Sequence, residues 1–401
     1  MDLQDGPRYR EFRRELRAFL QGWPLRGEEA SLPQARQAAL FRQRGIDRGY
    51  VYRQFPVDYG GSGREADVRI DAIVHEEYTA AGAPGDIVGP GPSLLAATLL
   101  EAGSESLRQR FIPPTLLGEI QWCQGYSEPG AGSDLASLRS RAERDGEEWV
   151  IHGHKIWTSN AHRADYMFGL FRTQPGTRRH DGISYLIIDM RQPGISVEAI
   201  RELTGSSHFN EVRFEGARTP REWTVGEPGK GWRIANITLR HERAMLGDVG
   251  SLEELFRALV DVAHTRGRTG DADVRQRLAA VEGALQSHCW TVRRRISAIA
   301  GGRESSVALP TLMLKLSAVR VREQIVRLAE DLLGDSFLGS PDQSIYKETP
   351  RSDAEWVAAS LRSLAYAIGG GTSNIQRNII AERGLGLPRE PAPGAPRGTR
   401  S

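Results

Sequence analysis

Residues 137–159 read "SLRSRAERDGEEWVIHGHKIWTS", and here the pattern of the sequence changes. Two strand-like runs flank "RDGEE", a charged turn that contains a glycine, and this arrangement is typical of a β-hairpin. Four more strand-like runs follow at spacings of roughly ten to fifteen residues, separated by glycines, prolines and charged turns. These runs are "DYMFGLFRT", "GISYLIIDM", "ISVEAI" and "NEVRFEGA". The sequence therefore predicts a compact antiparallel β domain over residues 121–232.

The sequence on both sides of this β domain has a helical period. In residues 1–120, apolar positions recur three and four apart in runs such as "RYREFRRELRAFL" and "DVRIDAIVHEEYTAA". In residues 233–387 the same period returns in long segments joined by short polar loops, which predicts a helix bundle. Residues 388–401 are rich in proline and glycine and are predicted to be disordered. The predicted fold class is α+β, with the order helical, β, helical.

The composition excludes several classes of protein. Of the 401 residues, 39% are hydrophobic and 26% are charged, which is ordinary for a globular protein, and a net charge of +2 does not favour nucleic acid or anionic lipid. Only four of the 53 basic residues are lysines, at positions 155, 230, 315 and 347. Two distant cysteines, Cys123 and Cys289, predict neither a disulfide framework nor a metal site. We expect a cytoplasmic protein without a membrane span, because no apolar signal region or run of about 18 apolar residues occurs.

Two short stretches in the β domain could carry chemistry. "WCQGYSEPGAGSDLASL" (122–138) reads as a strand that ends in a proline–glycine turn, with the hydroxyls of Ser127 and Ser133 beside glycines that let backbone approach a ligand. A capped β-turn without a ligand explains it equally well. In "HKIWTSN" (154–160), Trp157 is either a core residue or a flat surface beside a planar cofactor.

A third stretch, "GGGTSNIQRNII" (369–380), is a glycine run that opens into a predicted helix. Ser373 and Gln376 fit a capping box, and Gly384 and Pro388 supply the stop. Free N–H groups and the helix dipole make such a loop a potential anion cradle, although a simple turn is the commoner case. The loop contains no acidic side chain, so a base for catalysis would have to come from elsewhere.

These motifs, with "GEPGKGW" (226–232) and the extension to "GGGTSNIQRNIIAER" (369–383), resemble the acyl-CoA dehydrogenase family over almost the whole chain. The resemblance implies a helical N-terminal domain, a barrel-like middle domain and a C-terminal four-helix bundle. It also implies FAD as cofactor and a homotetramer, with a dimer or heterotetramer as alternatives. The residues implied to contact FAD are Tyr126, Ser127, Gly132, Ser133, Trp157, Thr158, Ser159 and, from a neighbouring subunit, Gly371, Thr372 and Asn374. Ser133 would also lie near the CoA phosphates, and Asn374 replaces a more usual glutamate or glutamine.

The resemblance offers two positions for the catalytic base. Many members carry a glutamate directly before the Gly-Thr of the terminal loop, where this chain has Gly370. The isovaleryl- and long-chain-type enzymes instead place the base before an arginine on a mid-chain helix, which matches Glu242 and Arg243 in "RHERAML". On a helical wheel Glu242 lies at the edge of an apolar arc, so an acyl chain could desolvate it and raise its pKa towards that of a general base. A solvated surface glutamate paired with a neighbouring arginine is the alternative.

The reaction implied is α,β-dehydrogenation of an acyl-CoA or acyl-carrier thioester. Glu242 would remove the α-proton, flavin N5 would accept the β-hydride, and the enolate oxygen would be held by the N–H of Gly370, a contact of roughly 3 kcal/mol. An electron-transferring flavoprotein would then accept the electrons. The chain lacks an arginine–phenylalanine–glycine segment that many relatives use to reach the neighbouring FAD; Arg266 or Arg268 could replace it, and Arg268 is favoured because "RTG" keeps an arginine just before a glycine.

Two other functions fit parts of the sequence. Relatives of the same fold that act as flavin monooxygenases dispense with the glutamate, which Gly370 favours and Glu242 opposes. A non-catalytic subunit of a heterotetramer is the other, and the intact "SEPGAGSD" and "WTS" motifs argue against it. Spacing does not fix the acyl cavity, so short, branched, long, steroid-like and carrier-bound acyl groups all stay open.

Overall fold

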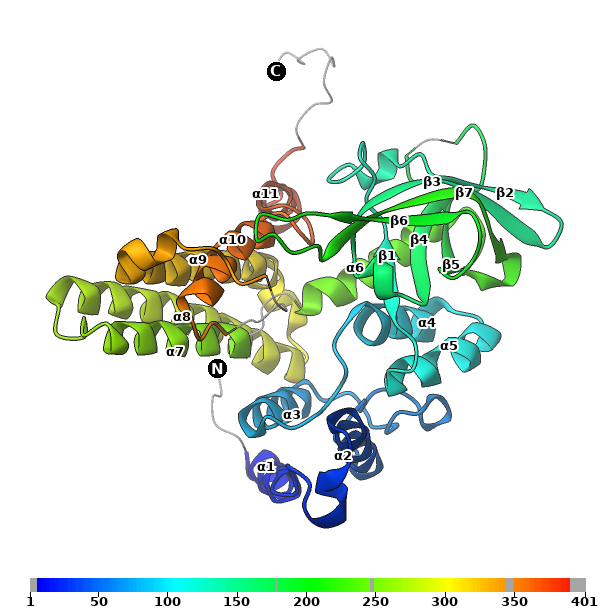
Figure 1. Ribbon diagram of the computed structural model, residues 1–401. Coiled ribbons are helices and arrows are strands. Elements are labelled where there is room, and N and C mark those ends of the chain that lie inside the picture. The colour runs from blue at the N-terminus through cyan, green and yellow to red at the C-terminus, as the bar shows by residue number, and fades with distance from the viewer. Residues whose placement is uncertain (1–5, 178, 246–248, 344–348, 390–401) are drawn as a thin grey trace. The chain divides into compact units, whose positions relative to one another are not determined.

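The computed structural model describes residues 6–177, 179–245, 249–343 and 349–389. The chain divides into two compact units (Figure 1). Of the described residues, the N-terminal unit comprises those in 6–245 with 341–343, and the C-terminal unit comprises those in 249–340 with 349–389. The predicted order of helical, β and helical segments is confirmed.

The N-terminal unit begins with five helices and closes with a sixth, α6, which follows the sheet. Their bounds are α1 Pro7–Leu20, α2 Gln34–Arg48, α3 Val68–Ala81, α4 Ala97–Ala102, α5 Glu105–Leu117 and α6 Gly231–Met245. Local signals explain their limits: the side chain of Asp67 accepts hydrogen bonds from the N–H groups of Arg69 and Ile70 and caps α3, and Gly82 ends that helix in the left-handed conformation.

Eight strands form one sheet in this unit. They are β1 Trp122–Gly125, β2 Arg141–Asp145, β3 Glu148–Ser159, β4 Tyr166–Arg172, β5 Ile183–Asp189, β6 Ile195–Ile200, β7 Phe209–Pro220 and β8 Thr224–Val225. The order is β6-β7-β3-β2-β4-β5-β8, with β1 on β4. The predicted hairpin at "RDGEE" is confirmed as β2–β3. The sheet is not wholly antiparallel as predicted, because β1 pairs with β4 in parallel and β2 meets β4 in parallel at one residue pair.

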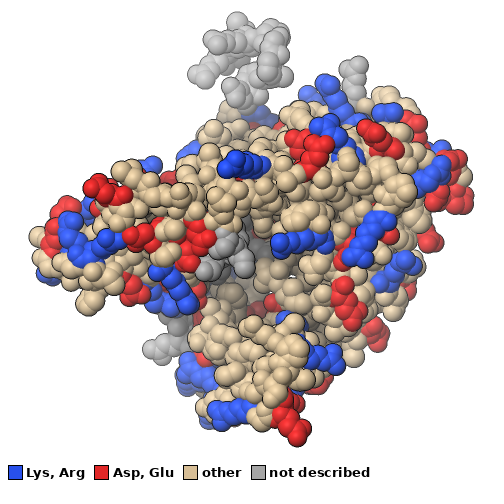
Figure 2. Space-filling view, in the orientation of Figure 1, with Lys and Arg blue, Asp and Glu red and all other residues tan. Residues whose placement is uncertain are grey.

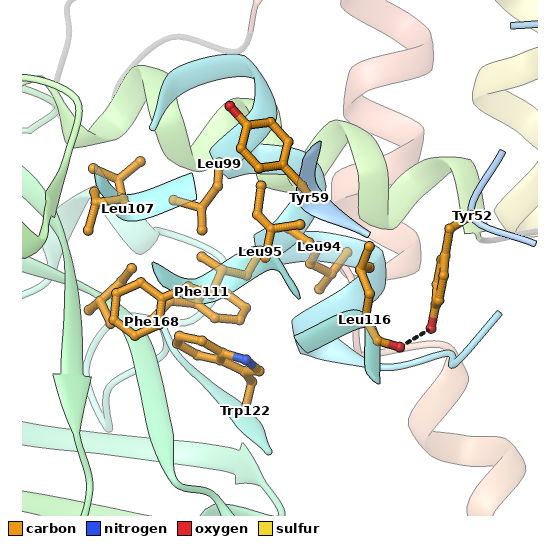
Figure 3. Close-up of a cluster of buried hydrophobic side chains, with 14 of the residues drawn as sticks. Tyr52, Tyr59, Leu94, Leu95, Leu99, Leu107, Phe111, Leu116, Trp122 and Phe168 are labelled. Carbon is orange, nitrogen blue, oxygen red and sulfur yellow. Dashed lines mark hydrogen bonds between the residues drawn. The ribbon is translucent and has the colours of Figure 1, made fainter. Parts of the chain in front are cut away.

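Both faces of the sheet are buried, and the alternation along β4 shows how. Phe168 and Leu170 face the core shared with the N-terminal helices, whereas Met167 and Phe171 face a second core formed by the sheet itself. Side chains alternate between faces because the strand has a period of two. Figure 3 shows part of the first core, where Phe111 of α5 meets Trp122 and Phe168, and Tyr52 donates to the carbonyl oxygen of Leu116 at 2.8 Å.

Helix α6 starts in direct contact with the sheet, and a glycine makes this possible. A Cβ on Gly231 would lie 2.5 Å from the backbone of Ser184 and Tyr185 in β5, closer than any side chain can approach. From this start, Ile234 and Thr238 are buried on the face of α6 that packs against the first core. The start of α6 is therefore fixed against β5, and Glu242 lies on the same helix, one turn after Thr238.

The C-terminal unit contains the predicted helix bundle. Its helices are α7 Val249–Thr265, α8 Ala272–Ala300, α9 Ala308–Leu333, α10 Asp353–Tyr366 and the short α11 Ser373–Ile379. Helices α7, α8 and α10 all pack against α9, and their apolar faces enclose a core around Trp356. The predicted capping box at Ser373 is wrong: Thr372 is the N-cap, and its hydroxyl accepts from the N–H of Ile375 at 3.2 Å. The one-residue shift follows from the glycine conformations that precede it.

On the face shown in Figure 2, basic and acidic side chains are interspersed rather than gathered by sign. Oppositely charged side chains also pair across strands: Arg218 of β7 forms salt bridges with Asp145 and Glu148, each at 2.8 Å. Within the described ranges, no helix is long and apolar enough to cross a membrane, and no three His, Cys, Asp or Glu residues are grouped to hold a metal. Cys123 and Cys289 are both buried free thiols.

Candidate active site

The loop after β1, residues 126–133, closes at once into a tight turn. The backbone groups of Glu128 and Ala131 exchange two hydrogen bonds, at 3.1 and 3.0 Å between N and O. The N–H of Ile156 in β3 donates to the carbonyl oxygen of Ser127 at 2.9 Å. Tyr126 is buried and Ser127 is half-buried. The structure thus brings the first predicted motif against the strand that carries the second.

A buried ion pair fixes this loop to the sheet. The Nζ of Lys155, a residue with no exposed surface, donates to Glu128 Oε1 at 2.8 Å, to the carbonyl oxygen of Leu170 at 2.8 Å and to that of Tyr126 at 3.3 Å. Burial raises the pKa of Glu128, but the Lys155 ammonium and backbone donors outweigh it, so that pKa lies below its ordinary value. Glu128 also accepts from the N–H of Arg139 at 2.6 Å. Loop and strand are therefore held as one rigid element.

Directly after Lys155, β3 departs from regular geometry. The pairing with β7 shifts between Lys155 and Thr158, and Trp157 adopts a φ of +60°, a conformation that costs a bulky residue about 1–3 kcal/mol. The bulge turns the Trp157 indole outward, where it is 57% exposed and touches only the edge of Phe209 among aromatic rings of the described chain. Thr158 is fully buried, and its hydroxyl has no hydrogen-bond partner among the residues described.

Four buried hydroxyl residues form a cluster between the loop, the sheet and α6. The hydroxyls of Thr98 and Thr238 lie 2.9 Å apart, and Thr238 donates to Tyr185 Oη at 3.3 Å. The Tyr126 ring meets that of Tyr185 edge-on, and its own hydroxyl is buried. We call Thr98, Tyr126, Tyr185 and Thr238 the hydroxyl cluster.

Glu242 lies one helical turn beyond the hydroxyl cluster. Its side chain is half-buried, and one carboxylate oxygen, Oε2, is shielded from solvent. Burial raises the pKa of Tyr126 well above its ordinary value, Tyr185 raises it further, and the negative charge of Glu242 adds the smallest of these contributions. The preceding residues face α4, because His241 contacts Glu101 at 2.7 Å and Arg240 forms a salt bridge with the same carboxylate.

The glycine loop 369–372 belongs to the C-terminal unit, and buried side chains of the same unit hydrogen-bond to its backbone. Gly370 and Gly371 have backbone φ values of +63° and +88°, which residues other than glycine rarely adopt. The Nζ of Lys315 in α9 donates to the carbonyl oxygens of Gly369 and Gly371, and Lys315 is only 6% exposed. Gln376 Nε2 donates to the carbonyl oxygen of Gly370 at 3.5 Å.

The other predicted residues occupy simpler positions. Gly132 and Ser133 are exposed at the tip of the loop, and Ser159 is half-buried at the end of β3. Asn374 is exposed and accepts from Arg377 at 3.0 Å. Arg266 and Arg268 lie in the loop between α7 and α8 and pair with Asp353 and Asp271, at 2.6 and 2.8 Å. The side chain of Arg243 lies outside the described residues.

The N-terminal unit fits a flat, polar heterocycle. An indole standing out from the bulge at Trp157 offers an apolar surface, and the buried hydroxyl of Thr158 can still form a hydrogen bond. The loop beside it is already rigid, so a ligand need not order it. These features match what the isoalloxazine of FAD requires.

Comparison with known proteins identifies the family. Models of the acyl-CoA dehydrogenase N-terminal, middle and C-terminal domains match residues 7–119, 123–217 and 229–385. Acyl-CoA dehydrogenase IpdE1 of Mycobacterium tuberculosis (strain ATCC 25618 / H37Rv) is 38% identical over 94% of this chain and 98% of its own length. The chain belongs to the acyl-CoA dehydrogenase family. It is accordingly an FAD-dependent oxidoreductase.

Solved structures of this family have the same fold. The structure named "Tcur3481-Tcur3483 steroid ACAD" is 28% identical, covers 97% of this chain and all of its own, and superposes with a TM-score of 0.77. A chain of the ChsE4-ChsE5 complex from Mycobacterium tuberculosis is 27% identical. The match covers 97% of this chain and 100% of that chain, with a TM-score of 0.75. The family membership and α+β fold that the motifs predicted are thus confirmed.

Sequence reasoning missed the two buried lysines. Lys155 lies within a quoted motif but received no role, and Lys315 was not singled out. A signal was available: a chain that uses arginine almost everywhere keeps only four lysines. A compact ammonium can be enclosed by several oxygens, whereas a planar guanidinium cannot. Two of these four lysines, Lys155 and Lys315, are buried among several oxygens, whereas Lys230 is exposed, so rarity alone does not separate the buried lysines from the others.

Proposed function

We propose that the chain oxidises an acyl thioester to the trans-2-enoyl thioester with Glu242 as the base that removes the α-proton. One observation carries this proposal: Glu242 has a carboxylate oxygen that is shielded from solvent, within the unit that holds the candidate flavin-binding residues. A base must lie close to the reacting carbon and in a partly desolvated place, and Glu242 meets the second condition directly. FAD, when bound, supplies the acceptor for the β-hydride.

The residues of the chain would divide the remaining work. Trp157 and Thr158 would orient the flavin ring from the bulge in β3, and Tyr126 and Ser127 would do so from the loop. Glu242 would accept the α-proton on its carboxylate, and the bonding electrons would move to the thioester oxygen. The N–H of Gly370 would stabilise the negative oxygen, since removing one such donor costs about 100- to 1,000-fold in rate.

For the thioester carrier we favour CoA. A hollow of about 640 Å³ beside the loop is lined by Asp134, Arg139, Arg172, Arg179 and His180, among others. Arg172 already donates to backbone carbonyl oxygens, among them those of Ala136 and Leu138. The proposal therefore rests on Arg139 and Arg179, because guanidinium groups can donate paired, charge-assisted hydrogen bonds to phosphate. Ser133, next to Asp134, stays in our proposal as a CoA contact, and Arg243 as a neighbour of the substrate.

The acyl group and the partners are proposed from the named relatives. One solved relative is named a steroid ACAD, so a thioester that carries a fused-ring acyl group is the first substrate to test. We propose an oligomer in which Gly371, Thr372, Asn374 and Arg268 of one subunit complete the FAD site of another. An electron-transferring flavoprotein is the proposed electron acceptor.

The test is a panel of straight, branched and ring-bearing acyl-CoA and acyl-carrier thioesters, assayed with a dye acceptor on wild type, Glu242→Gln and Glu101→Gln. Glu101 is the matched control, because it is a glutamate on α4 that already has two partners. Glu242→Gln should keep its flavin and lose about 100- to 10,000-fold in turnover, and Glu101→Gln should stay near wild type. Full turnover by Glu242→Gln would overturn the proposal.

A non-catalytic role within a two-chain complex is the second candidate. The two solved relatives described above are both named as pairs of different chains, which favours it. Flavin content per chain and turnover, measured on this chain purified alone and with any co-purifying partner, separate the two. Flavin and turnover in the chain alone support the first proposal, and a flavin-free, inactive chain supports the second.

A further inference from the structure

The glycine loop is fixed by two buried side chains that donate to its backbone carbonyl groups. Lys315 donates to the carbonyl oxygens of Gly369 and Gly371, and Gln376 donates to the carbonyl oxygen between them, on Gly370. Lys315 and Gln376 are both buried, at 6% and 4% exposure. Three successive carbonyl groups of the loop are therefore occupied within the C-terminal unit.

Because these contacts fix the directions of the carbonyl groups, they also fix the directions of the N–H groups in the same peptides. In a trans peptide the C=O and the following N–H point in opposite directions. Among the described residues the one cis bond is Trp23–Pro24, so the peptide between Gly369 and Gly370 is trans. Because Lys315 holds the carbonyl oxygen of Gly369, the N–H of Gly370 points away from the Lys315 ammonium.

The Lys315 ammonium affects how strongly the N–H of Gly370 can donate a hydrogen bond, as well as where that N–H points. A positive charge at a carbonyl oxygen draws electrons from the peptide, and its N–H becomes a better hydrogen-bond donor. The positive φ values of Gly370 and Gly371 let the chain fold tightly enough for one ammonium to reach two carbonyl groups. An arginine could not replace it, because its planar group needs a different arrangement of acceptors.

We propose that Lys315 is a positioning residue that aims and polarises the N–H of Gly370 as the donor to the thioester oxygen. This inference rests on the proposed function, because it assigns Lys315 to the same reaction. A lysine that only stabilised the bundle would instead affect folding and flavin content without changing how strongly the site favours a negative oxygen. The two roles therefore differ in a quantity that can be measured.

The experiment uses the flavin-loaded enzyme and an acyl-CoA in which sulfur replaces the β-carbon. This probe has acidic α-hydrogens but no β-hydride to give, so it reports enolate formation through the long-wavelength absorption that arises beside oxidised flavin. Lys315→Met and Lys315→Gln are compared with wild type and with Lys230→Met, a control that removes an exposed lysine. Flavin content and melting temperature are measured for each.

For Lys315→Met we expect about a ten-fold lower kcat with KM little changed, because the donor is weakened but not removed. The pH at which half of the bound probe is ionised should rise by about one unit, which corresponds to the same factor of ten. Lys315→Gln should fall between this variant and wild type, because it keeps an N–H donor without the charge, and Lys230→Met should match wild type. If the Met variant does not fold, the Gln variant alone decides.

An unchanged half-ionisation pH in a folded, flavin-loaded Lys315 variant would overturn the inference, whether or not its melting temperature falls. Failure of the proposed function gives a different result, because then Glu242→Gln would still ionise the probe as wild type does. Loss of ionisation in Glu242→Gln with a wild-type pH profile in both Lys315 variants would refute the role of Lys315 alone.

Discussion

Two loops of this chain are each anchored by one buried lysine, and the anchors differ. Lys155 joins a carboxylate, Glu128, and two carbonyl oxygens within a sheet whose strands already fix the loop. Lys315 contacts the carbonyl oxygens of the glycine loop, whose shape depends on left-handed glycines. Substitution of Lys155 should therefore mainly lower the free energy of unfolding, and substitution of Lys315 should mainly change how readily the α-proton is removed.

The largest expected effect on stability is that of Lys155→Met. Removing one partner of a buried ion pair leaves Glu128 enclosed without its countercharge, which costs about 3–5 kcal/mol. Urea unfolding followed by tryptophan fluorescence should show this loss, and the flavin should be released earlier. The double variant Lys155→Met/Glu128→Gln should recover part of it. A Lys155→Met protein as stable as Lys230→Met would contradict the account.

Acid should weaken the same anchor. The pKa of Glu128 lies below its ordinary value of 4.5, so its contribution is complete above about pH 4.5 and is lost as the pH falls through the lowered pKa. The difference in unfolding free energy between wild type and Glu128→Gln should thus shrink below pH 4.5. Glu143→Gln removes an exposed glutamate paired with Arg141 and should differ little from wild type at any pH. A difference for Glu128→Gln that is constant with pH would refute this contribution.

The smallest expected effect separates two glycines of the second loop, Gly369 and Gly371. Gly371 has a φ of +88°, and a Cβ there would lie 2.9 Å from Gln376 Nε2, whereas a Cβ on Gly369 would meet nothing nearer than 3.6 Å. Gly371→Ala should cost about 1 kcal/mol and Gly369→Ala almost nothing. Thermal melting of the two variants tests this, and equal melting temperatures would show that the loop is not held as described.

The sequence predicted the β-hairpin, the helical segments and the family, because period, turn residues and contiguous motifs are local signals. It did not predict the parallel pairing of β1 with β4, since that register depends on residues far apart along the chain. It placed the cap of α11 one residue late, at Ser373, because the positive φ of Gly371 is not visible in a run of three glycines.

For a similar reason the sequence predicted some residues of the candidate site but not how they are arranged. Motif residues such as Trp157 and Thr158 could be named, but the bulge that exposes one and buries the other depends on pairing with β7. Lys155 and Lys315 act through backbone carbonyl groups, which any sequence supplies, so their partners could not be read from side chains. Only the rarity of lysine pointed to them.

The central claim is that Glu242 takes the α-proton. The most direct measurement is the exchange of α-hydrogens for deuterium in the sulfur-containing acyl-CoA, followed by mass spectrometry in deuterated buffer, because it isolates proton removal from every later step. We predict that Glu242→Gln slows this exchange by about 100-fold or more while Glu101→Gln leaves it unchanged. Exchange at the wild-type rate in flavin-loaded Glu242→Gln would contradict the account.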